Sequence, residues 1–308
     1  MTNSSPKRAV DVDEHVAASR PTLATNAASV LTPEVVRAYL GSIGKPRLES
    51  YRIFFACASD TEVLGAYLWG QAIAGAFIPL VSSYEIVMRN AIHRRASLFS
   101  SKGATDSHPW YDYARKDALP TRGKSRDKIA ALLCERTGVR KSVQPAPDQV
   151  VATLSFGFWP NFLEGLGKRE QPRLLTDIFA HHPHSTPKHW GQETRVQQLI
   201  GALKSIQDLR NHIAHYEPIW KPHRLTGTET NWARSVRSLR HVHATILGVM
   251  GWCCPATPLV YQASYGARLF STLCTTNAVR LFMQNPFCAL QLAPMPLMTP
   301  EVAGAPTP

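Results

Sequence analysis

The stretch of 22 residues from Val63 to Tyr84 carries no formal charge, and it limits most strongly what this chain can fold into. It is long enough to cross a bilayer. However, it contains several glycines, a glutamine and Pro79, and its apolar spacing continues into a charged segment. We therefore expect two buried helices, broken between Gly75 and Pro79, because proline removes a backbone donor and clashes with the preceding turn. Insertion into a membrane is the alternative.

Apolar residues elsewhere recur at helical spacing. From Val196 to Ile213 they form a single stripe, which predicts an amphipathic helix that ends before Pro218. Thr32 before a proline and Ser59 before an acidic residue are typical helix N-caps. No convincing alternation typical of strands appears, so the sequence predicts an all-α helical bundle. The other expected helices cover residues 33–40, 48–58, 77–99, 128–136, 147–154, 160–166, 172–180, 232–249 and 259–282.

Composition divides the chain into three parts. Residues 1–30 are polar and aperiodic, which predicts a disordered N-terminal arm, and residues 31–250 carry the helical domain. Residues 251–308 form a low-charge C-terminal extension that ends in a proline-rich tail, expected to be disordered. The middle of this extension is either a buried interface or a poorly folded appendage.

The basic charge of the chain, +12 with a pI of about 9.6, is concentrated in two regions. Residues 86–141 hold 13 Lys and Arg against 5 Asp and Glu, and residues 168–240 hold 12 against 6. Such patches favour a polyanion, above all a nucleic acid. A merely soluble basic protein, or one that binds an acidic partner such as an antitoxin, is the alternative. The candidate RNA-binding residues are Arg122, Lys124, Arg126 and Lys128, in an expected mobile loop, and Arg234, Arg237 and Arg240, in a helical stripe.

The six cysteines form no CxxC pair, which is typical of a reduced cytoplasmic protein. The charged N-terminus lacks the apolar core of a signal peptide. His212 and His215 do not have the spacing of a zinc-binding helix. We therefore expect neither a metal nor another cofactor.

The most informative chemical motif is Arg210 and Asn211 followed by His215, at the end of the predicted helix 196–213. Arg210 projects into the apolar stripe, where an unpaired charge costs several kcal/mol, roughly, so it needs a carboxylate or a phosphate partner. Asn211 and His215 project to nearly the same edge. Arginine and histidine together can bind a phosphodiester and transfer a proton. The alternative is that His215 only caps the helix.

A second row of polar residues lies on the predicted helix 77–99. Glu85, Arg89 and His93 are spaced four apart, and Asn90 follows Arg89 as Asn211 follows Arg210. Exposed, such a row is a ladder of ion pairs worth a few tenths of a kcal/mol per pair. Lining a cleft, it could hold or polarise a phosphate.

Four stretches resemble the Abi-like family of abortive-infection proteins, which belongs to the HEPN group of helical nucleases. They are residues 66–95, the Trp-Tyr-Asp run at 110–112, residues 150–163 and residues 209–220. With the helices between them they cover about residues 47–250. The combination is specific to the family, whereas the Arg-Asn-x-x-x-His motif alone is not.

The resemblance implies a helical bundle that dimerises and brings two motifs to one shared site. Active members cut RNA without a metal, and many act as toxins or antiphage effectors, with an antitoxin or a phage-derived trigger as further candidate partners. It implies that Arg210, Asn211 and His215 are catalytic. The supporting residues would be Glu85, Arg89, Asn90, His93, His212 and Glu217.

Three hypotheses follow from the sequence. The first is a cytoplasmic, metal-independent endoribonuclease of antiphage or toxin–antitoxin defence that leaves a 2′,3′-cyclic phosphate. The second is a non-catalytic HEPN-like module that binds RNA or protein, in which Arg210 is a phosphate anchor or an internal ion pair. The third is a membrane-associated protein that uses residues 63–84.

Overall fold

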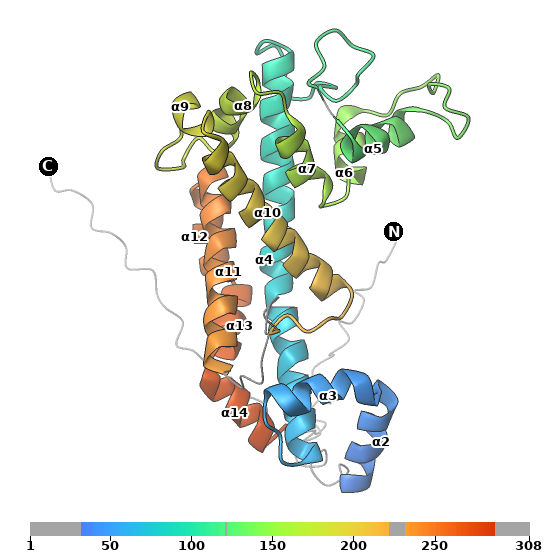
Figure 1. Cartoon of the computed structure of the whole chain (residues 1–308). Helices are drawn as coiled ribbons and strands as arrows, with labels where there is room; N and C mark the ends of the chain where they lie inside the picture. The colour runs from blue at the N-terminus through green and yellow to red at the C-terminus, as the bar shows by residue number, and fades with distance from the viewer. Residues whose placement is uncertain (1–31, 121, 222–231, 287–308) are drawn as a thin grey trace, which may run out of the picture.

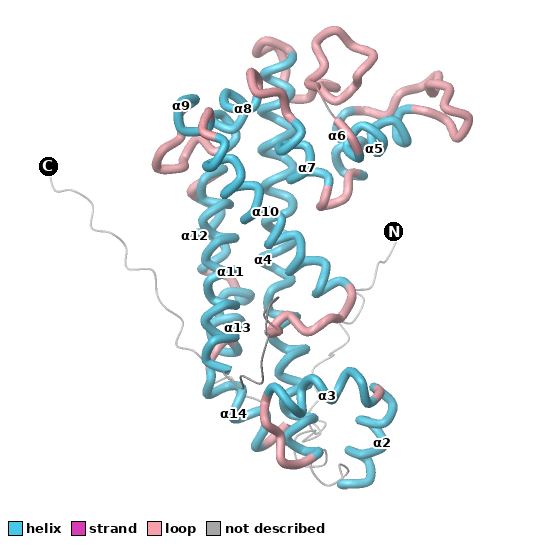
Figure 2. The backbone as a smooth tube through the Cα atoms, in the orientation of Figure 1, coloured by secondary structure: helices cyan, strands magenta, loops and turns pink. Residues whose placement is uncertain are grey.

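A computed structural model describes residues 32–120, 122–221 and 232–286. Thirteen helices and no strand lie within these ranges, which confirms the all-α fold class (Figure 2). The predicted arm over residues 1–30 and the tail from residue 287 lie outside the described residues.

The helix α4, Asp60–Ser100, is the centre of the fold and is a single helix of 41 residues (Figure 1). The predicted break between Gly75 and Pro79 is therefore wrong. Both residues lie on the exposed side of α4, so water can reach the Gly75 carbonyl that lacks its usual partner. The ring of Pro79 packs beside Gly266 instead of clashing with the core. Ala76, Phe77 and Leu80 bury the opposite side.

Several helices pack around α4. The helices α10, Glu193–Ala214, and α11, Trp232–Cys253, both contact it, and α10 crosses it obliquely (Figure 1). The helices α2, Pro33–Ile43, and α3, Lys45–Phe54, cover its N-terminal end. Trp220, after α10, packs against Tyr51 and Phe54 of α3. The last turn of α10 is therefore held between α4 and α3.

The low-charge extension forms three short helices instead of the one predicted over residues 259–282. They are α12, Ala256–Gln262, α13, Tyr265–Leu273, and α14, Thr276–Gln284. Ser264 and Thr275 divide them, because each side chain accepts a hydrogen bond from the backbone of the next helix. The extension packs directly on α4, where Trp69 Nε1 donates to the Leu273 carbonyl at 3.0 Å. Of the two interpretations left open, burial is confirmed.

The C-terminal end of α4 is covered by α5, Lys124–Leu133, α6, Pro147–Thr153, α7, Phe158–Gly165, α8, Gln171–Ile178, and α9, Pro187–Trp190 (Figure 1). The aromatic residues of 155–162 are core residues: Phe156, Phe158, Trp159 and Phe162 are all buried. They fill the space between α4 and α10 and so fix the spacing of these two helices.

Among the helices that the structure describes, only α4 is long and apolar enough to cross a membrane. In its most apolar window, 61% of the residues are buried inside the fold. A helix covered by α10, α11 and α14 has little apolar surface left for lipid, so the fold agrees with the core helix of a soluble protein.

Candidate functional site

The end of α10 presents the Arg-Asn-x-x-x-His motif. The helix ends at Ala214, and His215, predicted in the last turn, is the capping residue. Tyr216 then adopts a left-handed backbone with φ 57°. Its N–H donates to the Ile213 carbonyl at 3.1 Å, and the Glu217 N–H donates to the His212 carbonyl at 2.8 Å. These two backbone hydrogen bonds form the Schellman motif, and they fix the direction of His215 relative to the helix.

Arg210 faces α4. Its Nε lies 3.9 Å from Oε2 of Glu85, with the two side chains 40% and 24% exposed. The predicted anion for Arg210 is therefore a carboxylate of this same chain. The contact is at the outer limit of an ion pair, and the guanidinium has four further N–H groups to offer a ligand.

Asn211 and His215 follow Arg210 at the same end of α10. His215 is exposed, Asn211 is half-buried, and neither side chain has an ion pair or a side-chain hydrogen bond with any residue that the structure describes. An exposed imidazole without a partner can approach an incoming phosphodiester without breaking an existing contact. This end of α10 thus offers a cation, an amide and a proton-transfer group.

His212 and Glu217 form a separate contact below the motif. Nε2 of His212 lies 3.4 Å from Oε2 of Glu217, and the backbone bond between the same two residues closes the helix end. Both residues therefore stabilise the turn that carries His215.

Arg89 and Asn90, one turn beyond Glu85 on α4, line a pocket of about 550 Å³. Nε of Arg89 is buried and has no hydrogen-bond partner among the described residues. Arg94 and His93 share the pocket with two carboxylates, Asp106 and Asp148. A buried guanidinium nitrogen without a partner is costly, so Arg89 is a candidate to bind an anion.

His93, by contrast, is committed to the core. Its Nδ1 accepts a hydrogen bond from Nε1 of the fully buried Trp110 at 2.9 Å. Its Nε2 lies 3.3 Å from Oδ1 of Asp148, without the geometry of a hydrogen bond. Burial lowers the pKa of His93, and the Asp148 carboxylate opposes this only in part. The polar row on α4 therefore divides into Glu85, which meets Arg210, and His93, which braces the loop at Trp110.

The prediction of a mobile basic loop is partly wrong, because the second half of this segment belongs to α5. Lys128 donates to Ser155 Oγ at 2.7 Å, and the Arg126 guanidinium lies over the Tyr113 ring at 5.0 Å. Arg122 and Lys124 are exposed. These contacts hold Lys128 and Arg126, two of the four predicted residues, against the rest of the fold.

The predicted stripe on α11 also has mixed roles. Arg240 Nε donates to the Cys274 carbonyl at 3.0 Å and so attaches α11 to the end of α13. Arg237 is exposed, and Arg234 is exposed but takes part in a contact. The stripe is therefore partly structural.

Sequence reasoning missed two partners that shape this region. Asp148 faces His93, and Arg140 forms a two-pronged ion pair with Asp112, in which Nη1 lies 2.9 Å from Oδ1. The Arg140 hydrogen bonds lower the pKa of Asp112. Asp112 belongs to the Trp-Tyr-Asp run, but nothing in the spacing of Arg140 marks it as the partner.

Comparison with known proteins gives no relative. No family model, no curated protein and no solved structure matches this chain significantly.

Proposed function

We propose that this chain is a metal-independent endoribonuclease of the HEPN type that acts in the cytoplasm as an antiphage or toxin–antitoxin effector. The observation that carries the proposal is that one helix end holds both Arg210, loosely paired to Glu85, and His215, which is exposed and has no side-chain partner among the described residues. The net charge of +12 supports a polyanionic substrate.

The chemistry is an internal transesterification. The ribose 2′-OH loses its proton to His215 and attacks the adjacent phosphorus, and the bond from phosphorus to the 5′-oxygen breaks. A second histidine, His215 of the other protomer in a homodimer, gives its proton to the leaving 5′-oxygen. The products are a 2′,3′-cyclic phosphate and a 5′-hydroxyl. DNA lacks the 2′-OH and cannot react in this way.

Arg210 stabilises the charge that develops on the phosphorane oxygens. Removal of one such donor typically lowers kcat by about 10²–10³-fold. Asn211 can donate to a phosphate oxygen or orient the imidazole. Arg89, whose Nε has no hydrogen-bond partner among the described residues, is a further cation on α4 that could bind a neighbouring phosphate.

The test is induced expression of wild type beside Arg210→Ala and His215→Ala, with survival counted and total RNA run on a gel. We expect toxicity and RNA fragments in the wild type only. Fragment ends should be 2′,3′-cyclic phosphates, and cleavage by the purified protein should persist with a chelator present. Cleavage of DNA at a similar rate, or a requirement for magnesium, would contradict this mechanism.

A second candidate function is a non-catalytic module that binds RNA or protein. One observation favours it: Glu85 already supplies an anion for Arg210, as an internal ion pair would. Under this function His215→Ala retains both binding and any effect on cells. Repeating the expression test during phage infection separates it from a nuclease that awaits a trigger.

A further inference from the structure

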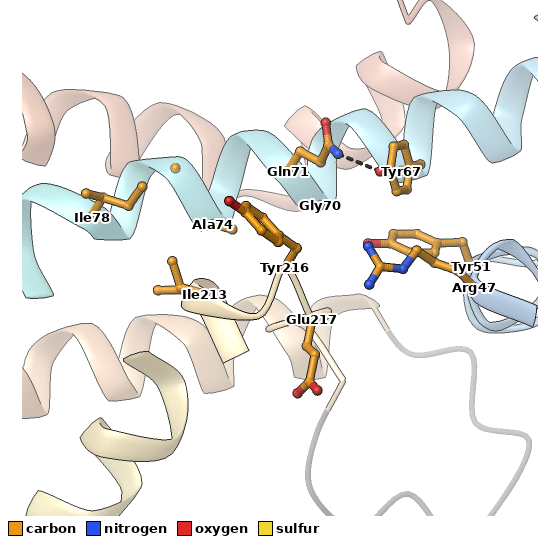
Figure 3. A pocket seen from close by; sticks show the side chains of 11 residues that line it. Arg47, Tyr51, Tyr67, Gly70, Gln71, Ala74, Ile78, Ile213, Tyr216 and Glu217 are labelled. Atoms are coloured by element: carbon orange, nitrogen blue, oxygen red, sulfur yellow. Dashed lines mark hydrogen bonds between the residues drawn. The ribbon is translucent and has the colours of Figure 1, made fainter. Parts of the chain in front are cut away.

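A pocket of about 320 Å³ lies directly beyond the motif, between α3, α4 and the end of α10 (Figure 3). Ile213 and Tyr216 form its wall on the α10 side, and they flank His215 in the chain. Gln71 and Ala74 of α4 and Tyr51 of α3 form the other sides. His215 does not line the pocket, but a ligand there would contact Tyr216, the next residue in the chain.

Tyr216 is the most unusual residue of this wall. Its side chain points toward α4 near Ala74, yet the residue is 83% exposed (Figure 3). Its left-handed backbone is the position where helices usually place glycine, since a side chain there is strained. The chain thus accepts strain to hold a large aromatic ring in solvent beside His215. Packing does not account for such a ring, because so little of it is covered.

Polar groups at the opposite side of the pocket have unused hydrogen-bonding capacity. Nε2 of Gln71 donates to the Tyr67 hydroxyl at 2.6 Å (Figure 3). Oε1 of Gln71 points away from Tyr216 in this view, and rotation of the amide would turn it toward the pocket as an acceptor. The Arg47 guanidinium lines the same side and has no side-chain partner among the described residues. The pocket thus presents a flat aromatic face at one side, with an acceptor and a fork of donors at the other.

We propose that this pocket binds one unpaired base of the RNA strand, stacked on Tyr216 with its polar edge toward Gln71 and Arg47. The inference rests on the proposed function and specifies how the substrate is chosen. A base has the shape that such a pocket takes: a flat π-face for the ring and an edge that offers both donors and acceptors. The nuclease would then require single-stranded RNA, because a paired base cannot leave its helix to enter.

The test measures binding in the non-cleaving His215→Ala background, so it does not depend on catalysis. The probes are a short fluorescent single-stranded RNA and a matched abasic ribose-phosphate chain. Tyr216→Ala should weaken binding of the RNA about tenfold, as the typical stacking contribution implies, and should leave binding of the abasic chain unchanged. Tyr216→Phe should retain the preference for bases. Tyr265→Ala is the matched control, since Tyr265 is 67% exposed and lies on α13, outside this pocket.

Tyr216→Gly separates binding from folding. It removes the strained side chain, so the melting temperature should rise while the RNA affinity falls. Equal affinities of Tyr216→Ala and Tyr265→Ala, equal binding of the two probes, or no RNA binding at all would overturn the base pocket.

The base pocket and the nuclease can fail separately. If RNA binding depends on Tyr216 but the protein never cuts RNA, the base pocket is supported and the nuclease function is rejected. Cleavage by the wild type that Tyr216→Ala does not alter in rate or sequence preference would do the opposite.

Discussion

Oε2 of Glu85 lies 3.9 Å from Nε of Arg210, so a loose ion pair joins α4 and α10 at the candidate site. The carboxylate holds the guanidinium against α4. It also places a negative charge where a phosphate would bind. Glu85 therefore has two opposing effects, which substitution can separate.

Glu85→Gln should tighten RNA binding and slow cleavage. The neutral amide no longer repels the phosphate, which lowers KM, while Arg210 loses its orientation, which lowers kcat by about tenfold or more. Steady-state kinetics on a single-stranded RNA measures both constants. Glu164→Gln is the control, because Glu164 forms a similar exposed pair with Lys204 on the other side of α10. A fall in RNA affinity with kcat unchanged would contradict these roles.

Trp110→Phe should destabilise the fold by about 2–3 kcal/mol, because Nδ1 of His93 loses its donor in the core. Urea unfolding measures this loss. If the hydrogen bond is responsible, Trp110→Phe combined with His93→Leu should cost less than the sum of the single changes, since no polar group then remains unsatisfied. RNA cleavage per folded molecule should stay near wild type in all three variants. Strict additivity would show that only packing at Trp110 matters.

Gly65→Ala should destabilise the fold by about 3 kcal/mol or more, as overpacking of a rigid contact does. A Cβ at Gly65 would lie 2.1 Å from the Phe282 carbonyl oxygen, and a backbone atom cannot move aside as a flexible side chain can. Gly201→Ala, at an exposed position of α10 with open space around it, should instead gain about 1 kcal/mol from helix propensity. Thermal unfolding of the two variants gives the comparison, and similar effects in both would argue against close packing of α14 on α4.

His243 should make stability depend on pH. Its ring stacks on Phe270 with centroids 3.9 Å apart, and burial lowers its pKa to about 4 from the ordinary value of 6.5. The unfolded chain then binds a proton at higher pH than the folded chain. This contribution is complete above pH 6.5 and is lost as the pH falls toward 4. Because the ring is only partly buried, solvent screening reduces it to about 2 kcal/mol.

Unfolding free energies measured between pH 7 and pH 4 check this dependence. His243→Phe keeps an aromatic ring at the stack and should flatten the pH profile, whereas His241→Phe, two residues earlier on an exposed side of α11, should leave the slope as in the wild type. An unchanged slope in His243→Phe would assign the dependence to other histidines.

Local signals in the sequence were sufficient for most helix starts. Thr32 and Ser59 cap α2 and α4 as predicted, because the capping bond spans only three residues. Ser264 and Thr275 carry the same signal inside the stretch predicted as one helix, so the division of α12, α13 and α14 was legible in the sequence. The break at Pro79 was wrong for a different reason. Whether proline interrupts a helix depends on the face it occupies, and that is decided by the packing of α4.

The site could be predicted only within single helices. The spacing of Arg210, Asn211 and His215 along α10 placed them together, and so did the spacing of Glu85, Arg89 and His93 along α4. That Glu85 meets Arg210, whereas His93 meets Trp110, depends on how the two helices cross and on the loop between them. The pocket at Tyr216 joins three helices, and no periodic signal predicts such a meeting.

Because α4 is unbroken, the number of residues between two of its positions decides which way their side chains point. At about 1.5 Å per residue, its 41 residues span on the order of 60 Å. This one helix sets the positions of four contacts: Gly65 with α14, Gln71 with the pocket, Glu85 with Arg210 and His93 with Trp110. One residue inserted after Pro79 would turn everything beyond it by about 100° and move Glu85 off its partner. Length can therefore change in the loops, but hardly within α4.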